Sequence, residues 1–422
     1  MNILNRKSKK NNKGLKNKIE NSSCNIKNYF KRNKNKFTIK ETLIFMVITF
    51  TFGMLIGGII MYGKGGFSGH YSTALNEFVD TYNDILNNYY KEVDADELLE
   101  SGLSGMINYL GDPYAAYMDQ STSESFSETI EGEYCGIGAE IVYTVSDGIT
   151  KVGTVFEGSP AEKAGLKVGD ILKEVDGKST EGMDSSAIAE IVKGKKGTKV
   201  TIKVVRNDKE INFTIKRDNV DIQSVESKIF EENSKKIGYL AISVFADNTD
   251  EQFEKALEKL EEDNIDSLII NVRNNTGGYL TSVTNIISLF TEKGTNIYQL
   301  KTKDETEIIK DKTKAYREYP INVLVNGSSA SASEVLAAAL KENYGATVMG
   351  TKTFGKGKVQ KSYTLSNGSL VKYTYQEWLT PEGNSIDGKG VEPNIIIEYQ
   401  YEENAEIDNQ LKETIIEISQ KQ

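Results

Sequence analysis

A run of twenty uncharged residues near the start of the chain restricts the fold most strongly. Residues 43–62 read LIFMVITFTFGMLIGGIIMY. A helix of that length spans about 30 Å, the thickness of the hydrocarbon core of a bilayer. A cleaved signal peptide has a shorter apolar region, about 7–15 residues, and a short charged leader. The sequence therefore predicts an uncleaved transmembrane helix over 43–62.

Charge is distributed unevenly on the two sides of this run. Residues 1–40 contain 13 Lys or Arg and one acid, Glu20. The whole chain has 51 Lys or Arg and 61 Asp or Glu, so residues 41–422 contain 38 basic and 60 acidic residues. By the positive-inside rule, the basic arm 1–42 is cytoplasmic and the catalytic part lies outside. The arm fits a disordered topology signal better than a nucleic-acid-binding segment. We expect a single-pass protein of the cell membrane with no nucleic-acid partner.

Histidine and cysteine are scarce in this chain, which limits its chemistry. It contains one histidine, His70, and two cysteines, Cys24 and Cys135. This excludes multi-histidine metal sites, zinc clusters and a disulfide framework. The predicted topology also places the two cysteines on opposite sides of a membrane, where they do not pair. We expect no metal and no cofactor, and catalysis by Ser, Thr, Lys or carboxylates.

The part after the apolar run divides into regions of different periodicity. After the linker 63–69, apolar residues recur at helical spacing, which predicts a small helical region at 71–130. From about residue 236, apolar strands alternate with helical segments, which is typical of an α/β layer core. We place that core at 218–400, with the helical region packing on it, and a helical tail at 401–422.

Between these regions the pattern changes to short strands separated by glycines. Three blocks follow one another, namely GIGAEIVY at 136–143, SPAEKAGLKVGDILKEVDG at 159–177 and VTIKVVRNDKEINFTI at 200–215. In this order they resemble a PDZ domain, which we place at 131–217. The backbone N–H groups of Gly136, Ile137 and Gly138 can hold a terminal carboxylate while the following strand pairs with an extended peptide. Proteins or peptides with free C-termini are the expected partners.

A cluster of serines marks the point where an apolar strand meets an Ala/Leu helix. The segment INVLVNGSSASASEVLAAAL holds Ser328, Ser329, Ser331 and Ser333 at that turn. A helix N-terminus can stabilise an oxyanion, because its N–H groups are free and its dipole end is positive. Serine at a helix start is also the usual N-cap, so this segment alone does not identify a nucleophile.

The segment GTKTFGKGKVQ at 350–360 admits two interpretations. Gly350, Gly355 and Lys356 fit a phosphate-binding loop, but Gly357 stands where the magnesium-binding Ser or Thr should be. The following residues predict a hairpin and not the helix that such a loop needs, which disfavours an NTPase. Alternatively, Lys356 is a base. Only about one lysine in a thousand is neutral near pH 7.4, so this role requires a desolvated pocket.

Taken in order, these segments resemble the carboxyl-terminal processing peptidases, a family of Ser–Lys serine peptidases. The resemblance runs from about residue 72 to the C-terminus and includes VRNNTGG, SASASE, TFGKGKVQ and TPEGNSIDGKGVEPN. It implies Ser331 as the nucleophile, Lys356 as the general base and Gln360 as the residue that orients the lysine. It also implies an oxyanion hole formed by the N–H groups of Ala332 and of Gly277 or Gly278.

The predicted fold class is thus multidomain, with a transmembrane helix, a helical region, a PDZ-like β-rich domain and an α/β serine peptidase core. The segment GDPYAAY at 111–117 departs from the family, which often has histidine and serine after Asp-Pro. We expect a membrane-anchored endopeptidase that recognises C-termini and forms an acyl-enzyme, and a homo-oligomer is compatible with this. The alternative is a silent PDZ adaptor, although an adaptor should have lost Ser331, Lys356 or Gln360.

Overall fold

The chain divides into two compact units, residues 1–98 and 99–422. The computed structural model describes residues 46, 49–50, 73–144, 148–314, 316–403 and 405–421. In the first unit, α3 (Thr73–Asn88) precedes the start of α4 (Ala95–Tyr109), which continues into the second unit. The Tyr82 hydroxyl donates to the Ala95 carbonyl at 2.8 Å and so joins the two helices.

The predicted fold class is corrected in one respect, the transmembrane helix over 43–62. No helix among the described residues is both long and apolar enough to cross a membrane. Of that segment, only Met46, Thr49 and Phe50 are described, and the basic arm 1–42 lies outside the described residues. Hydropathy alone carried the prediction. Hydropathy measures which surroundings a segment tolerates, and not which backbone conformation it takes.

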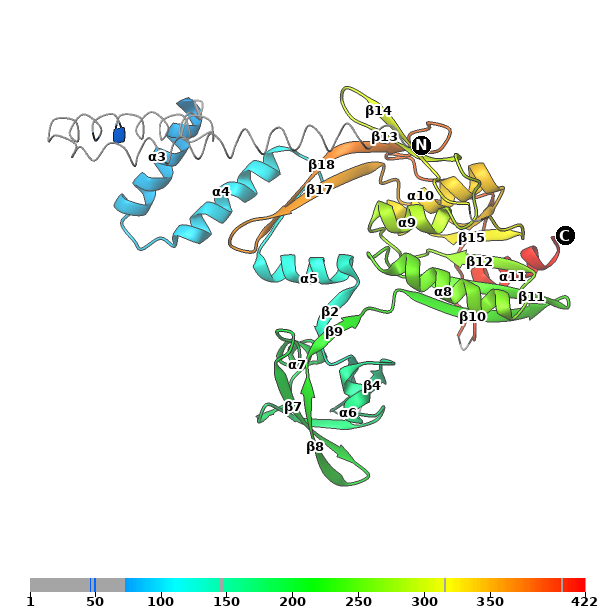
Figure 1. Cartoon of the computed structure of the whole chain (residues 1–422), viewed down its shortest axis with the longest axis horizontal. Coiled ribbons are helices and arrows are strands. Elements are labelled where there is room, and N and C mark those ends of the chain that lie inside the picture. The colour runs from blue at the N-terminus through cyan, green and yellow to red at the C-terminus, as the bar shows by residue number, and fades with distance from the viewer. Residues whose placement is uncertain are drawn as a thin grey trace, which may run out of the picture. The chain divides into compact units, whose positions relative to one another are not determined.

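Residues 133–221 of the second unit form a β-rich domain with its own core (Figure 1). Its main sheet has the strand order β3-β4-β5-β7-β8, with β6 paired to β5, and a separate ribbon pairs β2 with β9. Buried side chains such as Ile188, Ile202 and Ile215 fill the space between the sheet and its helices. Its elements are β2 (Glu133–Gly136), β3 (Ala139–Thr144), β4 (Ile149–Val155), α6 (Pro160–Ala164), β5 (Ile171–Val175), β6 (Lys178–Ser179), α7 (Ser185–Val192), β7 (Lys199–Arg206), β8 (Lys209–Lys216) and β9 (Asp218–Asp221).

The rest of the second unit is built on a six-stranded sheet of order β10-β11-β12-β15-β16-β19. Its central strands are parallel and buried on both faces, which explains their near-continuous apolar sequences. Leu268 and Ile270 pack into the core on one face, while Ile269 packs under α11 on the other. Its elements are β10 (Val225–Glu232), β11 (Lys235–Ile242), α8 (Thr249–Glu262), β12 (Ser267–Asn271), α9 (Leu280–Ile287), β15 (Ile321–Val325), α10 (Ala332–Ala339), the π-helix η1 (Leu340–Tyr344), β16 (Thr347–Gly350), β19 (Ile395–Ile396) and α11 (Asn409–Ser419).

A second sheet carries the long hairpin that follows Lys356. In it β18 pairs with β1, β13 and β17, and β13 also pairs with β14. The helix α5 follows β1 and leads into the β-rich domain (Figure 1). The bounds are β1 (Ala116–Met118), α5 (Gln120–Glu131), β13 (Asn296–Lys301), β14 (Thr306–Lys310), β17 (Lys358–Thr364) and β18 (Leu370–Leu379).

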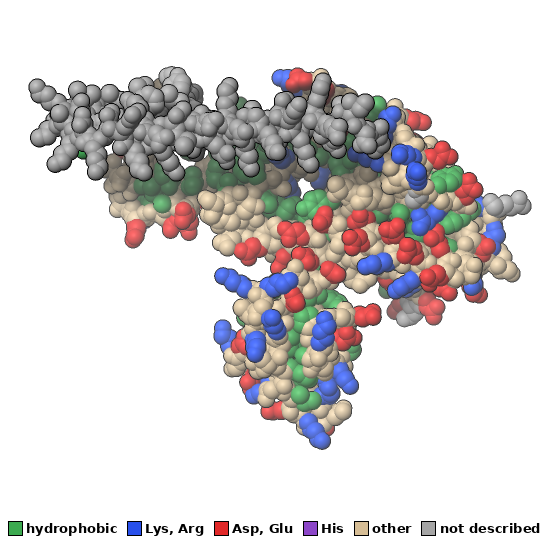
Figure 2. All heavy atoms as spheres, viewed as in Figure 1, with side chains coloured by type: hydrophobic (Ala, Val, Ile, Leu, Met, Phe, Trp, Pro, Cys, Tyr) green, Lys and Arg blue, Asp and Glu red, His purple; other side chains and the backbone are tan. Residues whose placement is uncertain are grey.

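Both signs of charge are interspersed over the visible surface of the described residues (Figure 2). Acidic side chains are frequent over the α/β core, and Lys and Arg are frequent over the β-rich domain (Figure 2). On the visible face of the α/β core, no continuous basic surface of the kind that binds nucleic acid stands out among the described residues.

Candidate active site

The serine turn lies between the end of β15 and the start of α10, and only some of its serines are buried. Ser329 Oγ donates to the Val272 carbonyl and Ser333 Oγ donates to the Asn275 carbonyl, both at 2.8 Å. Ser331 lies between them at φ 55° and ψ −115°, a conformation that L-residues rarely adopt. It lines a cleft. The two buried serines therefore anchor the turn, and the strained one between them remains accessible.

Glu334, on the first turn of α10, is fully buried and accepts four hydrogen bonds. The donors are Ser331 N at 2.8 Å, Thr353 Oγ1 at 2.6 Å, Gly355 N at 2.7 Å and Lys356 N at 2.9 Å. One carboxylate thus joins the serine turn to the loop that carries Lys356. Our sequence reasoning missed this residue, although the S-x-x-E spacing from Ser331 is the signal of a capping box.

Lys356 lies in the loop between β16 and β17. Both its backbone N–H and its backbone carbonyl form hydrogen bonds. Its N–H donates to Glu334, and its carbonyl accepts from the Trp378 indole at 2.9 Å. Its Nζ atom lies 5.1 Å from the centre of the Tyr114 ring. Burial, and then the charge of Lys372, lower the pKa of Lys356, while the charges of Glu334 and Asp112 act in the opposite direction. The lysine is therefore shifted toward the neutral amine that a general base needs.

Asp112 and Tyr114 belong to the segment in which the sequence departs from the family pattern. The Asp112 carboxylate accepts from Tyr114 N at 2.9 Å and from Thr374 N at 3.4 Å. The segment that differs from the family pattern therefore lies directly beside Lys356, and not only within the helical region.

Gln360 lies on β17 and lines the same cleft as Ser331 and Lys356. Its side-chain amide donates to Thr374 Oγ1 at 3.5 Å. No hydrogen bond joins it to Lys356 within the described part of the chain. The role of orienting the lysine stays a prediction.

The turn that contains Gly277 and Gly278 lies against the serine turn. Gly277 N donates to Asn275 Oδ1 at 2.8 Å, so this N–H is already used. The N–H groups of Gly278 and Ala332, by contrast, have no acceptor among the described residues. A Cβ atom at Gly277 would lie 2.8 Å from Ser331 Cβ, and one at Gly278 would lie 2.1 Å from the Phe245 carbonyl oxygen. Only glycine allows this close approach.

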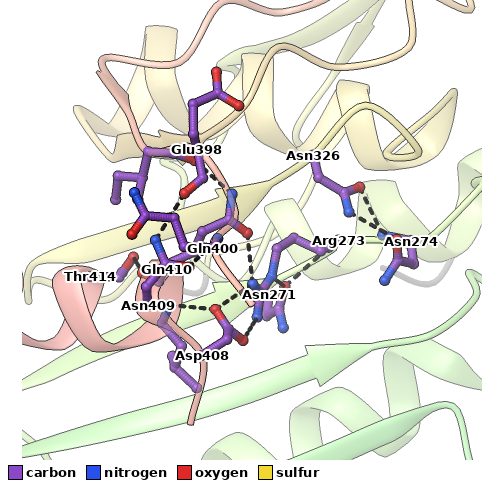
Figure 3. A network of polar contacts seen from close by, with 12 residues as sticks. Asn271, Arg273, Asn274, Asn326, Glu398, Gln400, Asp408, Asn409, Gln410 and Thr414 are labelled. Atoms are coloured by element: carbon purple, nitrogen blue, oxygen red, sulfur yellow. Dashed lines mark hydrogen bonds and ion pairs between the residues drawn. The ribbon is translucent and has the colours of Figure 1, made fainter. Parts of the chain in front are cut away.

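A polar network supports this turn from the side of α11 (Figure 3). Arg273 donates to both carboxylate oxygens of Asp408, at 2.8 and 2.9 Å, and to Gln410 Oε1 at 2.8 Å. Asn274 and Asn326 exchange hydrogen bonds of 3.0 and 2.8 Å, which link the glycine turn to the serine turn. The start of α11 thus helps to hold the turn that contains Gly278.

These groups surround a cleft of about 730 Å³. Its walls are α5, the glycine turn and the hairpin β17–β18. Apolar side chains such as Phe126, Ile130 and Leu370 line much of it, together with the cations Lys356, Lys358 and Lys372. Its size and its mostly apolar walls fit an extended peptide segment. Among the described residues, no cluster of His, Cys, Asp or Glu is suited to a metal ion.

A second, smaller cavity of about 430 Å³ lies in the β-rich domain beside β3 and α7. Gly136 and Ile137 line it. Gly138, at φ 77°, belongs to the adjoining turn, where its carbonyl accepts from Phe156 N at 3.0 Å. Tyr134, which our sequence reasoning did not single out, also lines this groove, and burial raises its pKa while a hydrogen bond from Gly138 N–H opposes the shift.

The sequence is similar to known families over three segments. Residues 236–397 match "Peptidase family S41", residues 151–206 match "PDZ domain", and residues 64–122 match "Activating protease CtpB N-terminal domain".

Individual proteins show the same similarity. The chain is 39% identical over 327 residues to carboxy-terminal processing protease CtpB of Bacillus subtilis (strain 168), which covers 77% of this chain and 68% of that protein. It is 36% identical over 327 residues to a protein named as a CtpA-like serine protease of Staphylococcus aureus (strain COL), covering 77% and 65%. A solved structure, the photosystem II D1 C-terminal processing protease, shares 26% identity at a TM-score of 0.45, covering 76% of this chain and 86% of that one. The chain spans about two thirds of the length of these curated relatives.

Proposed function

This chain belongs to peptidase family S41 as a carboxyl-terminal processing serine peptidase with a PDZ domain, and on that premise we propose that Ser331 and Lys356 are its catalytic pair. The observation that carries the proposal is their common setting. Both line one cleft, and the backbone N–H groups of both donate to the buried carboxylate of Glu334. The family membership disfavours the alternative of a silent adaptor.

The reaction follows from the protonation state of the lysine. The neutral Lys356 amine takes the proton of Ser331 Oγ while that oxygen attacks the carbonyl carbon of the scissile bond. The C–N bond then breaks, the leaving amine takes the proton from the Lys356 ammonium, and the acyl group remains on Ser331 as an ester. Water, deprotonated by Lys356, attacks the ester and releases the second product and the serine.

The oxyanion that forms during each attack needs donors placed in advance. Ala332 N and Gly278 N are suited to this, because neither N–H group has an acceptor in the described part of the chain and the two turns that carry them are linked. Gly277 is less suited, since its N–H is bonded to Asn275. Each such donor contributes about 10²–10³-fold in kcat. Gln360, which lines the same cleft from β17, would orient the lysine.

We further propose that the PDZ domain selects substrates by their free C-terminus. The N–H groups of Gly136 and Ile137 would bind the carboxylate together with that of Gly138, which in the free protein donates to the Tyr134 hydroxyl, and the groove beside β3 and α7 would take the last side chains. Support comes from the position of Gly136 and Ile137 in the wall of that groove. The cellular location of the enzyme and its oligomeric state stay predictions from the sequence.

The catalytic pair is tested by substitution in the full chain. Ser331→Ala and Lys356→Ala should each lower kcat by at least about 1000-fold, because each removes a group that acts in both chemical steps. Matched controls come from the same turn and loop: Ser328→Ala and Lys352→Ala change exposed residues and should retain activity. His70→Ala should retain it too. Turnover preserved in either Ser331→Ala or Lys356→Ala would contradict the proposal.

A further inference from the structure

The segment TPEGNSIDGKGVEPN at 380–394 packs against the loop that carries Lys356. Ile386 of this segment is buried in the core of the α/β layer, so the segment is itself held in place. Gly388 N donates to the Gly355 carbonyl at 2.9 Å and joins the two loops. The proposed catalytic pair leaves this segment without a role, although it is one of the blocks on which the family resemblance rests.

Every backbone N–H and carbonyl group of residues 355–357 forms a hydrogen bond. The partners of all but one of these groups are Glu334, Trp378 and Gly388. The remaining group, Gly357 N–H, donates to Asp387 Oδ1 at 3.2 Å. The side chain of Lys356 thus extends from a backbone that is hydrogen-bonded throughout, and Asp387 supplies the acceptor directly after it.

Asp387 approaches this loop closely because residue 357 is a glycine. A Cβ atom at Gly357 would lie 2.8 Å from Asp387 Cβ and 2.9 Å from Asp387 N. A phosphate-binding loop would need Ser or Thr at this position, so the glycine that disfavours an NTPase also makes room for the carboxylate. The second oxygen, Asp387 Oδ2, pairs with Lys358 Nζ at 3.0 Å. One side chain therefore contacts both residues that follow Lys356 in the chain.

We propose that Asp387 is a positioning residue for the reaction: by accepting from Gly357 N–H, it fixes the backbone from which Lys356 reaches Ser331 Oγ. Asp387 does not touch the reacting atoms. The inference rests on the proposed catalytic pair, because the position of this backbone matters only if Lys356 takes the proton of Ser331. A catalytic group misplaced by about 1 Å can lose about 100-fold in rate while the protein stays folded.

Substitutions in the full chain separate the hydrogen bond from the charge of Asp387. Asp387→Ala removes both and should lower kcat for a fluorogenic peptide by about 10- to 100-fold with little change in KM. Asp387→Asn removes the charge but keeps an oxygen acceptor for Gly357 N–H, so its kcat should stay within about threefold of wild type. The matched control is Lys389→Ala, which shortens an exposed side chain of the same segment and should retain activity.

The fluorescence of Trp378 provides a second readout that follows the loop itself. Trp378 is the single tryptophan of the chain, it is buried, and it donates to the carbonyls of Lys356 and Gly357. In Asp387→Ala, acrylamide should quench this fluorescence more strongly than in wild type, while the far-UV circular dichroism stays the same. Asp387→Asn and Lys389→Ala should both show the quenching of wild type.

Other outcomes overturn the inference. Equal losses of kcat in Asp387→Asn and Asp387→Ala would assign the effect to the ion pair with Lys358. A raised KM at unchanged kcat would indicate a substrate contact, and a lowered kcat without a change in quenching would show that Asp387 does not act through the loop.

Gly357→Ala replaces Asp387→Ala if that variant fails to fold. The added methyl group would displace the same carboxylate, and Gly357 does not have a positive φ, so wild-type kcat in Gly357→Ala would overturn the inference. The catalytic pair is judged separately. If Ser331→Ala and Lys356→Ala are inactive while Asp387→Ala is fully active, only the role of Asp387 fails.

Discussion

The cleft of the α/β core and the groove of the PDZ domain both present backbone N–H groups, but they hold them in different ways. The cleft donors lie on two turns joined by buried polar groups, including Asn275, Ser329, Ser333 and Glu334, all fully buried. The groove donors lie in a glycine turn beside Tyr134 and a short helix, α7. This difference in how firmly the donors are held matches the functions proposed for the cleft and the groove. Under the proposed functions, donors that stabilise a transition state must be fixed in advance, whereas a site that would capture peptide ends tolerates adjustment.

The largest effect should come from Glu334, because its one carboxylate joins the serine turn to the loop that carries Lys356. Glu334→Ala leaves four donors without an acceptor and should lower kcat/KM by at least about 1000-fold, and the free energy of unfolding by about 4 kcal/mol or more. Glu334→Gln keeps one acceptor oxygen and should lose less of both. Activity assays and urea unfolding measure the two effects. Glu392→Ala, at an exposed residue paired with Lys352, is the control. Near-normal activity in Glu334→Ala would show that the cleft is not preorganised by this carboxylate.

Gly278→Ala tests the donors of the cleft directly. The added Cβ would meet the Phe245 carbonyl oxygen at 2.1 Å and displace the turn, so kcat should fall by about 10²–10³-fold with little change in KM. Gly294→Ala is a matched control, because Gly294 also has a positive φ, 94°, but nothing within 4 Å of its Cβ position. Steady-state kinetics of both variants separates displacement of the turn from backbone strain. Equal losses in the two variants would remove Gly278 from the oxyanion hole.

A smaller effect on cleavage rate is expected from changing the C-terminus of the substrate, which the groove of the PDZ domain is proposed to bind. An unstructured substrate that ends in a free apolar carboxylate should be cut at least tenfold faster than the same chain ending in an amide, since each lost charge-assisted hydrogen bond costs about 1.5–3 kcal/mol. The difference should reside in KM. Binding of both peptides to the Ser331→Ala variant provides the second measurement. Equal rates and equal affinities would leave the PDZ domain without a role in reading the terminus.

The smallest effect should come from the network behind the glycine turn. Burial acts to raise the pKa of Asp408, but hydrogen bonds and the charge of Arg273 outweigh it and lower that pKa. A carboxylate with a lowered folded pKa stabilises the protein above its unfolded pKa, about 3.9, and loses this contribution as the pH falls through the folded value. The Tm difference between wild type and Asp408→Asn should therefore be full at pH 6 and shrink below about pH 4. A difference that is constant with pH would contradict the ion pair with Arg273.

Much of the architecture could be predicted, because it follows from local patterns. The apolar runs of β12 and β15 are short and continuous, and the glycine-punctuated strands at 131–217 carry a recognisable order, so the PDZ domain and the α/β peptidase core were predicted correctly. The transmembrane helix was wrong, because hydropathy alone carried that prediction. The role of Gln360 in orienting the lysine stays a prediction: its side-chain contact in the structure is Thr374, which lies on the opposite strand of its own hairpin.

The sequence by itself determined that Ser331 stands at a strand-to-helix turn and that Lys356 stands in a glycine-rich loop before a hairpin, since these depend on chain geometry over a few residues. Only the tertiary structure decided what surrounds them. Thr374 and Asp112 are 262 positions apart in the chain, yet they meet beside Lys356, and Arg273 finds Asp408 at a separation of 135. The protonation of a buried amine depends on distances through space to Lys372, Asp112 and Glu334. Local sequence patterns do not encode those distances, because folding alone brings the charges together.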